Sequence, residues 1–197
     1  MARTRLLTVG LLWTFLLGCR SSDSPSLQAP PGPSASAAPA SESASPQTPL
    51  PVAKPFVGTT GLTEQVSNGA SARLVDVRAA SHEGYDRVVL EFAEGSPGYR
   101  IEYVDKPVRQ CGSGDVEPVE GQGWLSIQLF PADAHTPEGQ PTVAPRERLL
   151  DLKNVRELQM TCDFEATVTW VVGVRSPNSY RVSELRQPSR LIVDIQH

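Results

Sequence analysis

The segment from Gly84 to Tyr103 reads GYDRVVLEFAEGSPGYRIEY and decides the fold of this chain. Apolar residues alternate with polar or charged ones twice in it, first at Val88, Leu90 and Phe92 and then at Tyr99, Ile101 and Tyr103. This period of two is typical of a β-strand with one buried face. The stretch 94–98 between the two runs contains two glycines and a proline, which favours a turn. We therefore expect two consecutive antiparallel strands.

The same alternation recurs on both sides of this segment. It occurs at Val75 and Val77, at Leu125, Ile127 and Leu129, at Val168, Trp170, Val172 and Val174, and at Leu191, Val193 and Ile195. Short strands at this spacing predict an all-β fold, either an antiparallel sandwich or a barrel. Helical spacing is limited to Leu149, Leu152 and Val155, so we expect at most one helical turn there, before a strand over residues 155–162.

Residues 56–197 form the predicted folded domain, and its 142 residues are enough for one sizeable core. The domain has 14 lysines and arginines against 20 aspartates and glutamates, a net charge of −6. This balance argues against nucleic acid and against anionic wall polymers as bulk partners. Local groups of arginines can still bind a carboxylate.

The amino-terminal segment has the pattern of a bacterial lipoprotein signal. Arg3 and Arg5 precede the apolar run 6–17, and Gly18 stands directly before Cys19. The apolar run is short for a transmembrane span, so residues 1–18 are predicted to be a cleaved signal peptide. The Cys19 thiol would then carry a diacylglycerol, and its amino group a further acyl chain such as palmitate. The alternative is an ordinary secretory signal with a chance cysteine.

Residues 19–55 are predicted to be a disordered linker that follows the lipidated cysteine. Positions 20–55 contain 9 serines, 9 prolines and 7 alanines among 36 residues, too few apolar side chains to build a core. Such a chain spans roughly 30–40 Å as a flexible coil and about 110 Å as polyproline II. It either lets the domain reach a cell-wall layer or is a spacer of no specified length.

Two cysteines remain beside Cys19, and these are Cys111 and Cys162. An oxidising envelope compartment favours one disulfide between them. A metal or redox site is not expected, because the chain has no CxxC pair and its three histidines lack ligand spacing. No cofactor is predicted.

Several segments resemble the AMIN-like domain of bacterial envelope lipoproteins. They are 84–92 followed by 97–103, then 129–135, 163–165 leading into Trp170 and Gly173, 180–185, and 188–195, where a proline and an arginine introduce a last strand with Asp194. The resemblance covers about residues 72–197 and implies a β-sandwich. Domains of the wider AMIN group accompany wall amidases and secretion or pilus components, which implies a role at the envelope in contact with peptidoglycan.

An enzymatic function is not expected from this sequence. A wall amidase needs a zinc site with several histidine and glutamate ligands, and a serine or cysteine hydrolase needs a base beside its nucleophile. His82 falls in a predicted turn and His135 in a loop rich in proline and aspartate, where solvated histidines are common. Paired carboxylates for glycoside cleavage stay open, but no pair stands out among the many acidic residues.

Arg87, Arg190 and Asp194 are candidate binding residues because the alternation directs them away from the core. One interpretation is structural: Arg87 or Arg190 pairs with Asp194 across strands. The other is functional: the arginines, beside Val89 and Ile192, bind a carboxylate of a wall peptide or a partner protein. Trp124 is a further candidate, either as an exposed indole that stacks on a sugar or as a tryptophan covered by a loop.

These observations predict a lipid-anchored, non-enzymatic envelope protein that binds peptidoglycan or a wall-associated protein. One alternative is an interaction module of a secretion or assembly complex. Another is a carrier of a small apolar ligand, with a cavity among Phe92, Tyr103 and Trp170. The predicted location is the periplasmic side of the outer membrane where a cell has one, which Arg20 favours, and otherwise the outer face of the plasma membrane.

Overall fold

The computed structural model describes residues 55–197, which contain eleven β-strands and no helix, and therefore no helix fit to cross a membrane. The strands are β1 (Thr63–Gln65), β2 (Ala72–His82), β3 (Tyr85–Phe92), β4 (Gly98–Val104), β5 (Gly123–Phe130), β6 (Ala132–Asp133), β7 (Glu147–Leu149), β8 (Val155–Phe164), β9 (Thr167–Val174), β10 (Tyr180–Arg186) and β11 (Ser189–Gln196). The predicted signal peptide, Cys19 and all but the last residue of the predicted linker lie outside the described residues.

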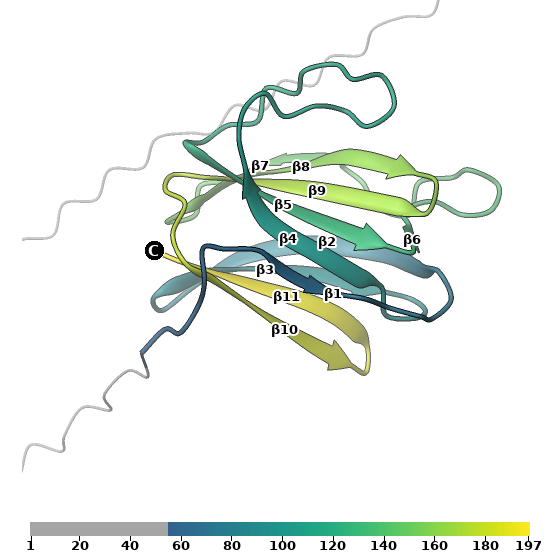
Figure 1. The fold of residues 1–197 in the computed structure, drawn as a ribbon, viewed down its shortest axis with the longest axis horizontal. Helices are drawn as coiled ribbons and strands as arrows, with labels where there is room; N and C mark the ends of the chain where they lie inside the picture. Colours follow the sequence, from purple (N-terminus) through teal and green to yellow (C-terminus); the bar gives the residue numbers. More distant parts are fainter. Residues whose placement is uncertain (1–54) are drawn as a thin grey trace, which may run out of the picture. The chain divides into compact units, whose positions relative to one another are not determined.

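The strands form two sheets that pack face to face, with β5, β8 and β9 in the upper layer of Figure 1 and β3, β11 and β10 in the lower. The six-stranded sheet has the order β1-β4-β5-β9-β8-β7, and the five-stranded sheet has the order β10-β11-β3-β2-β6. All neighbours are antiparallel except β2 and β6. The prediction of an antiparallel sandwich is confirmed.

The apolar residues of the alternating runs meet between the sheets. Leu90 from β3, Ile127 from β5 and Trp170 from β9 are buried in this core. Phe92 and Trp170, which a ligand carrier would need around a cavity, pack in the core itself. The sandwich interior is therefore filled at these positions by side chains.

The first predicted strand differs from its expected pattern. Val75 was expected to share a buried face with Val77, but Leu74 and Val77 are the buried residues and Val75 is half-exposed. The reason is a register shift between Leu74 and Asp76, where β2 pairs with β3. An extra residue at a β-bulge reverses the direction of the side chains that precede it.

Two buried polar side chains join the layers. The Asp86 carboxylate of β3 accepts hydrogen bonds from the backbone N–H groups of Asn154 (2.6 Å) and Val155 (2.9 Å), at the start of β8. The Tyr180 hydroxyl of β10 lies 2.6 Å from the carbonyl oxygen of Gly61 and 2.7 Å from that of Ile101. Hydrogen bonds thus connect the two sheets at two places beside the apolar core.

The connection 105–122 between β4 and β5 folds over the outer face of the six-stranded sheet. A disulfide joins Cys111 to Cys162 of β8, as predicted, and the Cys111 N–H donates to the Thr161 carbonyl (3.0 Å). A Cβ atom at Gly173 would lie 1.9 Å from the Glu120 carbonyl oxygen, so this close approach requires a glycine. The loop therefore covers this outer face around Trp124, Val171 and Cys162.

Candidate functional site

Arg87 and Asp194 lie opposite each other on the outer face of the five-stranded sheet. Arg87 donates to both carboxylate oxygens of Asp194 (2.7 and 3.0 Å), and Arg181 of β10 donates to the same carboxylate at 2.9 Å. Burial alone would raise the pKa of Asp194, but hydrogen bonds from the two arginines outweigh it and lower that pKa. Two cations share one carboxylate, which leaves this group with one positive charge in excess.

Aromatic side chains surround these arginines. The Arg87 and Arg181 guanidinium carbons lie 5.3 and 5.0 Å from the Tyr85 ring centre, and Arg181 lies 4.7 Å from that of Phe56. The His82 ring stacks on Tyr85 at 5.1 Å. A depression of about 570 Å³ opens beside them, lined by Pro55, Phe56, Glu83, Gly84, Tyr85, Arg181, Gln196 and His197. We call this group the arginine site.

Arg190 belongs to a second group of ion pairs on the same face. It donates to Glu91 (3.0 Å), and Arg78 donates to both Glu91 (3.0 Å) and Asp76 (2.5 Å). Arg190 therefore does not pair with Asp194, and of the two predicted cross-strand partners Arg87 has that role. Charges in this second group balance, because two arginines meet two carboxylates.

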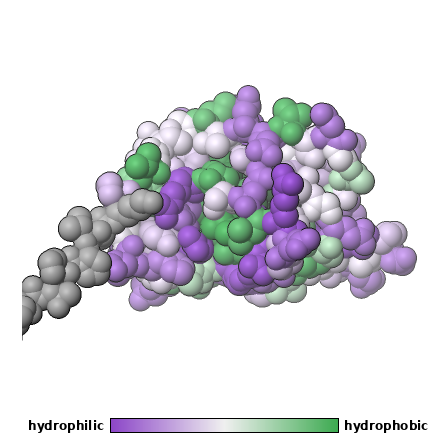
Figure 2. All heavy atoms as spheres, turned by 90° about the horizontal axis from the view of Figure 1, so that it is seen from below, coloured by the Kyte–Doolittle hydropathy of each residue, from purple (hydrophilic) through white to green (hydrophobic). Residues whose placement is uncertain are grey.

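Val89 and Ile192 form the cross-strand pair between the two ionic groups. Figure 2, which views the molecule from below in Figure 1, shows hydrophobic residues gathered near the middle of the face with hydrophilic ones around them. The sequence-predicted combination of arginines beside apolar residues is thus present on one sheet face.

Trp124 lies on β5 of the other sheet, apart from Arg87, Arg190 and Asp194. Its indole N–H donates to the Val119 carbonyl (3.1 Å), and the Lys106 ammonium lies 4.4 Å from its ring centre. The ring packs with Val119 and Val171 in a small second cluster. Of the two interpretations of Trp124, the loop-covered one matches this environment.

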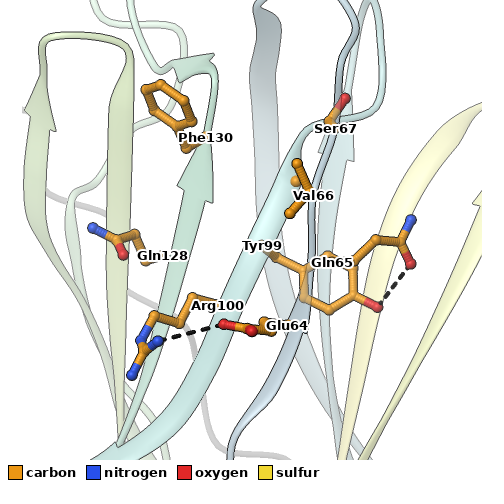
Figure 3. Close-up of a pocket in the computed structure, with 9 residues that line it drawn as sticks. Glu64, Gln65, Val66, Ser67, Tyr99, Arg100, Gln128 and Phe130 are labelled. Atoms are coloured by element: carbon orange, nitrogen blue, oxygen red, sulfur yellow. Dashed lines mark hydrogen bonds and ion pairs between the residues drawn. The ribbon is translucent and has the colours of Figure 1, made fainter.

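A groove of about 220 Å³ lies on the outer face of the six-stranded sheet, over the end that loop 105–122 leaves open. Its lining residues are Glu64, Gln65, Val66, Ser67, Gly98, Tyr99, Arg100, Gln128 and Phe130. Figure 3 shows Val66 and Phe130 on either side of β4, with Arg100 and Glu64 joined by an ion pair below them. None of these residues was predicted as part of a site.

The sequence does contain a signal for Phe130. Because Leu125, Ile127 and Leu129 point inward, the alternation directs Phe130 outward together with Trp124. No such signal exists for Val66, which follows a strand of only three residues, β1.

His135 and His197 each lie near one carboxylate. His135 Nδ1 lies 2.8 Å from the Asp163 carboxylate, which also accepts a hydrogen bond from Arg146. Within residues 55–197 no group of three or more histidine, cysteine, aspartate or glutamate side chains could hold a metal ion. The candidate sites on the described residues are the arginine site and the groove.

Comparison with protein families identifies the family of this chain. The sequence model of the AMIN-like domain matches residues 72–197, which covers all strands from β2 to β11. No curated protein and no solved structure matches the chain.

Proposed function

The chain belongs to the AMIN-like domain family, and on that premise we propose that it is a lipid-anchored, non-enzymatic protein whose folded domain binds peptidoglycan. AMIN-like domains are non-catalytic domains of the cell envelope, so the protein is an envelope protein. A wall-associated protein partner is the alternative ligand of the same domain.

The anchor is Cys19, which follows an apolar run and a glycine at the end of a signal-like segment. Two or three acyl chains hold a protein at a membrane, since each buried methylene contributes about 0.8 kcal/mol. Cells fed labelled palmitate should incorporate the label into the wild-type chain and into a Ser21→Ala control, but not into Cys19→Ser. Label in the Cys19→Ser protein would contradict the anchor.

The observation that carries peptidoglycan binding is that two guanidinium groups, those of Arg87 and Arg181, share the single carboxylate of Asp194 at the edge of a depression whose lining also includes Glu83. Arg87 and Arg181 share Asp194 as their carboxylate, and both lie beside aromatic rings that keep the guanidinium groups in place. Guanidinium groups bind carboxylates through paired hydrogen bonds. The stem peptides of peptidoglycan carry such carboxylates, so the arginine site is the proposed contact with the stem.

Co-sedimentation with purified, protein-free peptidoglycan tests this proposal. The full chain, kept soluble in detergent, should sediment with the polymer at physiological salt, and Arg87→Ala and Arg181→Ala should weaken retention. Arg175→Ala is the matched control, because this exposed arginine pairs with Asp151 away from the two ionic groups.

Trp124→Ala should retain binding, since its ring is already held by Lys106 and Val119. Absence of wild-type retention would contradict direct wall binding. Crosslinking in intact cells would then be the way to find a protein partner.

A further inference from the structure

Three large apolar side chains remain exposed in one cross-strand row of the six-stranded sheet. Phe130 is 58% exposed, Phe164 is 59% exposed and Val66, next to β1, is 84% exposed. Leu129 pairs with Val168 and Phe164 pairs with Thr167, so the two phenylalanines end their strands at the same level on either side of β9. Exposed apolar groups that gather in this way mark interaction sites.

The spacing of the two rings follows from the sheet. β5 and β8 are both neighbours of β9, which puts the strands of Phe130 and Phe164 two strand spacings apart, about 9.5 Å. That separation is close to the length of a disaccharide unit. Two exposed rings at this distance can therefore face successive repeats of a glycan.

A polar row lies directly beside the apolar one. Glu64, Arg100, Gln128 and Thr169 are register partners across β1, β4, β5 and β9. Arg100 is paired with Glu64 (3.4 Å) and with Glu102 (2.7 Å), so one guanidinium meets two carboxylates and this group has one negative charge in excess. This row offers hydrogen-bond donors and acceptors without excess positive charge, which suits a neutral hydroxylated ligand and not an anionic peptide.

Gly98 also lines the groove, where it pairs with Phe130 across β4 and β5. A Cβ atom at this position would lie 2.6 Å from the Gln65 carbonyl oxygen and 2.9 Å from that of Phe130. The glycine therefore permits the close approach of β1, β4 and β5 and adds no side chain to the groove.

We propose that this face, the glycan platform formed by Val66, Phe130, Phe164, Glu64, Arg100 and Gln128, binds the glycan strand of peptidoglycan. Sugar rings stack on Phe130 and Phe164 through their apolar faces, while the polar row hydrogen-bonds to hydroxyl and acetamido groups. The inference rests on the proposed function for the choice of the wall as ligand. It adds a second site, on the sheet opposite the arginine site, that recognises a different part of the same polymer.

The test uses the full chain in detergent and glycan strands freed of their stem peptides, with the lactyl carboxylates that this exposes converted to amides so that the probe is neutral. Titration calorimetry should detect binding by the wild type, and Phe130→Ala or Phe164→Ala should weaken it at least about fivefold, as expected for aromatic anchors. Phe130→Leu keeps an apolar side chain without a ring face and should also lose affinity. Leu149→Ala is the matched control, because this apolar side chain is 64% exposed but lies outside the glycan platform and the arginine site.

Each result separates this inference from the proposed function. Wild-type binding to intact peptidoglycan but not to stem-free glycan would overturn the glycan platform and leave the proposed function standing. Glycan binding that neither phenylalanine variant weakens would overturn the assigned site. Absence of binding to either polymer would overturn both.

Discussion

The outer faces of the two sheets carry different kinds of side chain. Both sheets direct apolar residues inward, yet on the five-stranded sheet the outward residues include two groups of ion pairs, Arg87 and Arg181 with Asp194 and Arg190 with Glu91. On the six-stranded sheet the outward side is divided between a disulfide-held loop and exposed rings such as Phe130. The five-stranded sheet therefore presents grouped charges, with two arginines on the one carboxylate of Asp194, whereas the six-stranded sheet leaves large apolar side chains exposed.

The carboxylates of the two faces also differ. Asp194 has a lowered pKa because its two arginines outweigh the effect of burial. Glu157, beneath loop 105–122, has a raised pKa, mainly because of burial and despite the hydrogen bond from the Glu120 N–H. The acidic neighbours Glu147, Glu120 and Glu117 add to this increase. Ionisation of Asp194 therefore stabilises the five-stranded sheet. Ionisation of Glu157 destabilises the contact between loop 105–122 and the six-stranded sheet.

The largest effect is expected from removal of the disulfide. Closing a loop of about 50 residues contributes about 4 kcal/mol in the chain-entropy model, so Cys111→Ser with Cys162→Ser should lower the free energy of unfolding by up to that amount. Urea unfolding measures it, with Cys19→Ser as control. An unchanged midpoint would mean that apolar contacts alone hold the loop on the six-stranded sheet. The disulfide would then not be the reason why this face is covered.

Asp194→Ala should have the next largest effect. The change leaves Arg87 and Arg181 without their shared carboxylate, and because both arginines are partly exposed we expect a loss of about 2 kcal/mol and not the full cost of a buried pair. Asp76→Ala, at the exposed end of the other ionic group, is the control and should cost less than about 1 kcal/mol.

The stability that ionised Asp194 contributes depends on pH in one direction. A carboxylate with a lowered folded pKa contributes stability above the unfolded value, about 3.9, and loses it as the pH falls through the folded pKa. The wild type should therefore lose stability below about pH 4, and Asp194→Asn should lose less over that interval. Equal slopes in both proteins would contradict the role of the arginines.

Glu157→Gln should have a smaller effect of the opposite sign. Because the folded pKa of Glu157 is raised, its ionisation lowers stability as the pH rises from the ordinary glutamate value, about 4.3, through the folded pKa. The glutamine keeps an acceptor for the Glu120 N–H and should stabilise the protein at neutral pH by less than about 1 kcal/mol. Thermal unfolding of Glu157→Gln and of the wild type at pH 4 and pH 7 measures this difference. A variant less stable than the wild type at pH 7 would contradict a destabilising charge on Glu157.

The smallest effect on stability is expected for Phe130→Ala. More than half of this side chain is exposed, so the loss should stay within about 0.5 kcal/mol. Leu129→Ala is its buried neighbour and should cost about 2–5 kcal/mol. A Phe130→Ala loss close to that of Leu129→Ala would show that Phe130 is a structural residue, and the glycan platform would lose its main ring.

The sequence predicts the features that depend on local alternation and on the number of cysteines. It predicts the inward residues of β3 and β11, the Cys111–Cys162 disulfide, and a pair between Asp194 and either Arg87 or Arg190, of which the structure has Arg87. It fails where a bulge changes the register, as at Val75, and a second register shift in β8, between Met160 and Cys162, hides the outward direction of Phe164. The covering of Trp124 depends on a loop whose path is set by long-range contacts, which no local pattern reveals.

The most direct test of the two-face account is to map backbone amide chemical shifts of the full chain in two titrations. Stem-free glycan should shift amides of β1, β4 and β5 around Val66, Arg100 and Phe130, whereas free stem peptide should shift amides of β3, β10 and β11 around Arg87, Arg181 and Asp194. Perturbation of one and the same face by both ligands would contradict the division of the wall polymer between the two sheets.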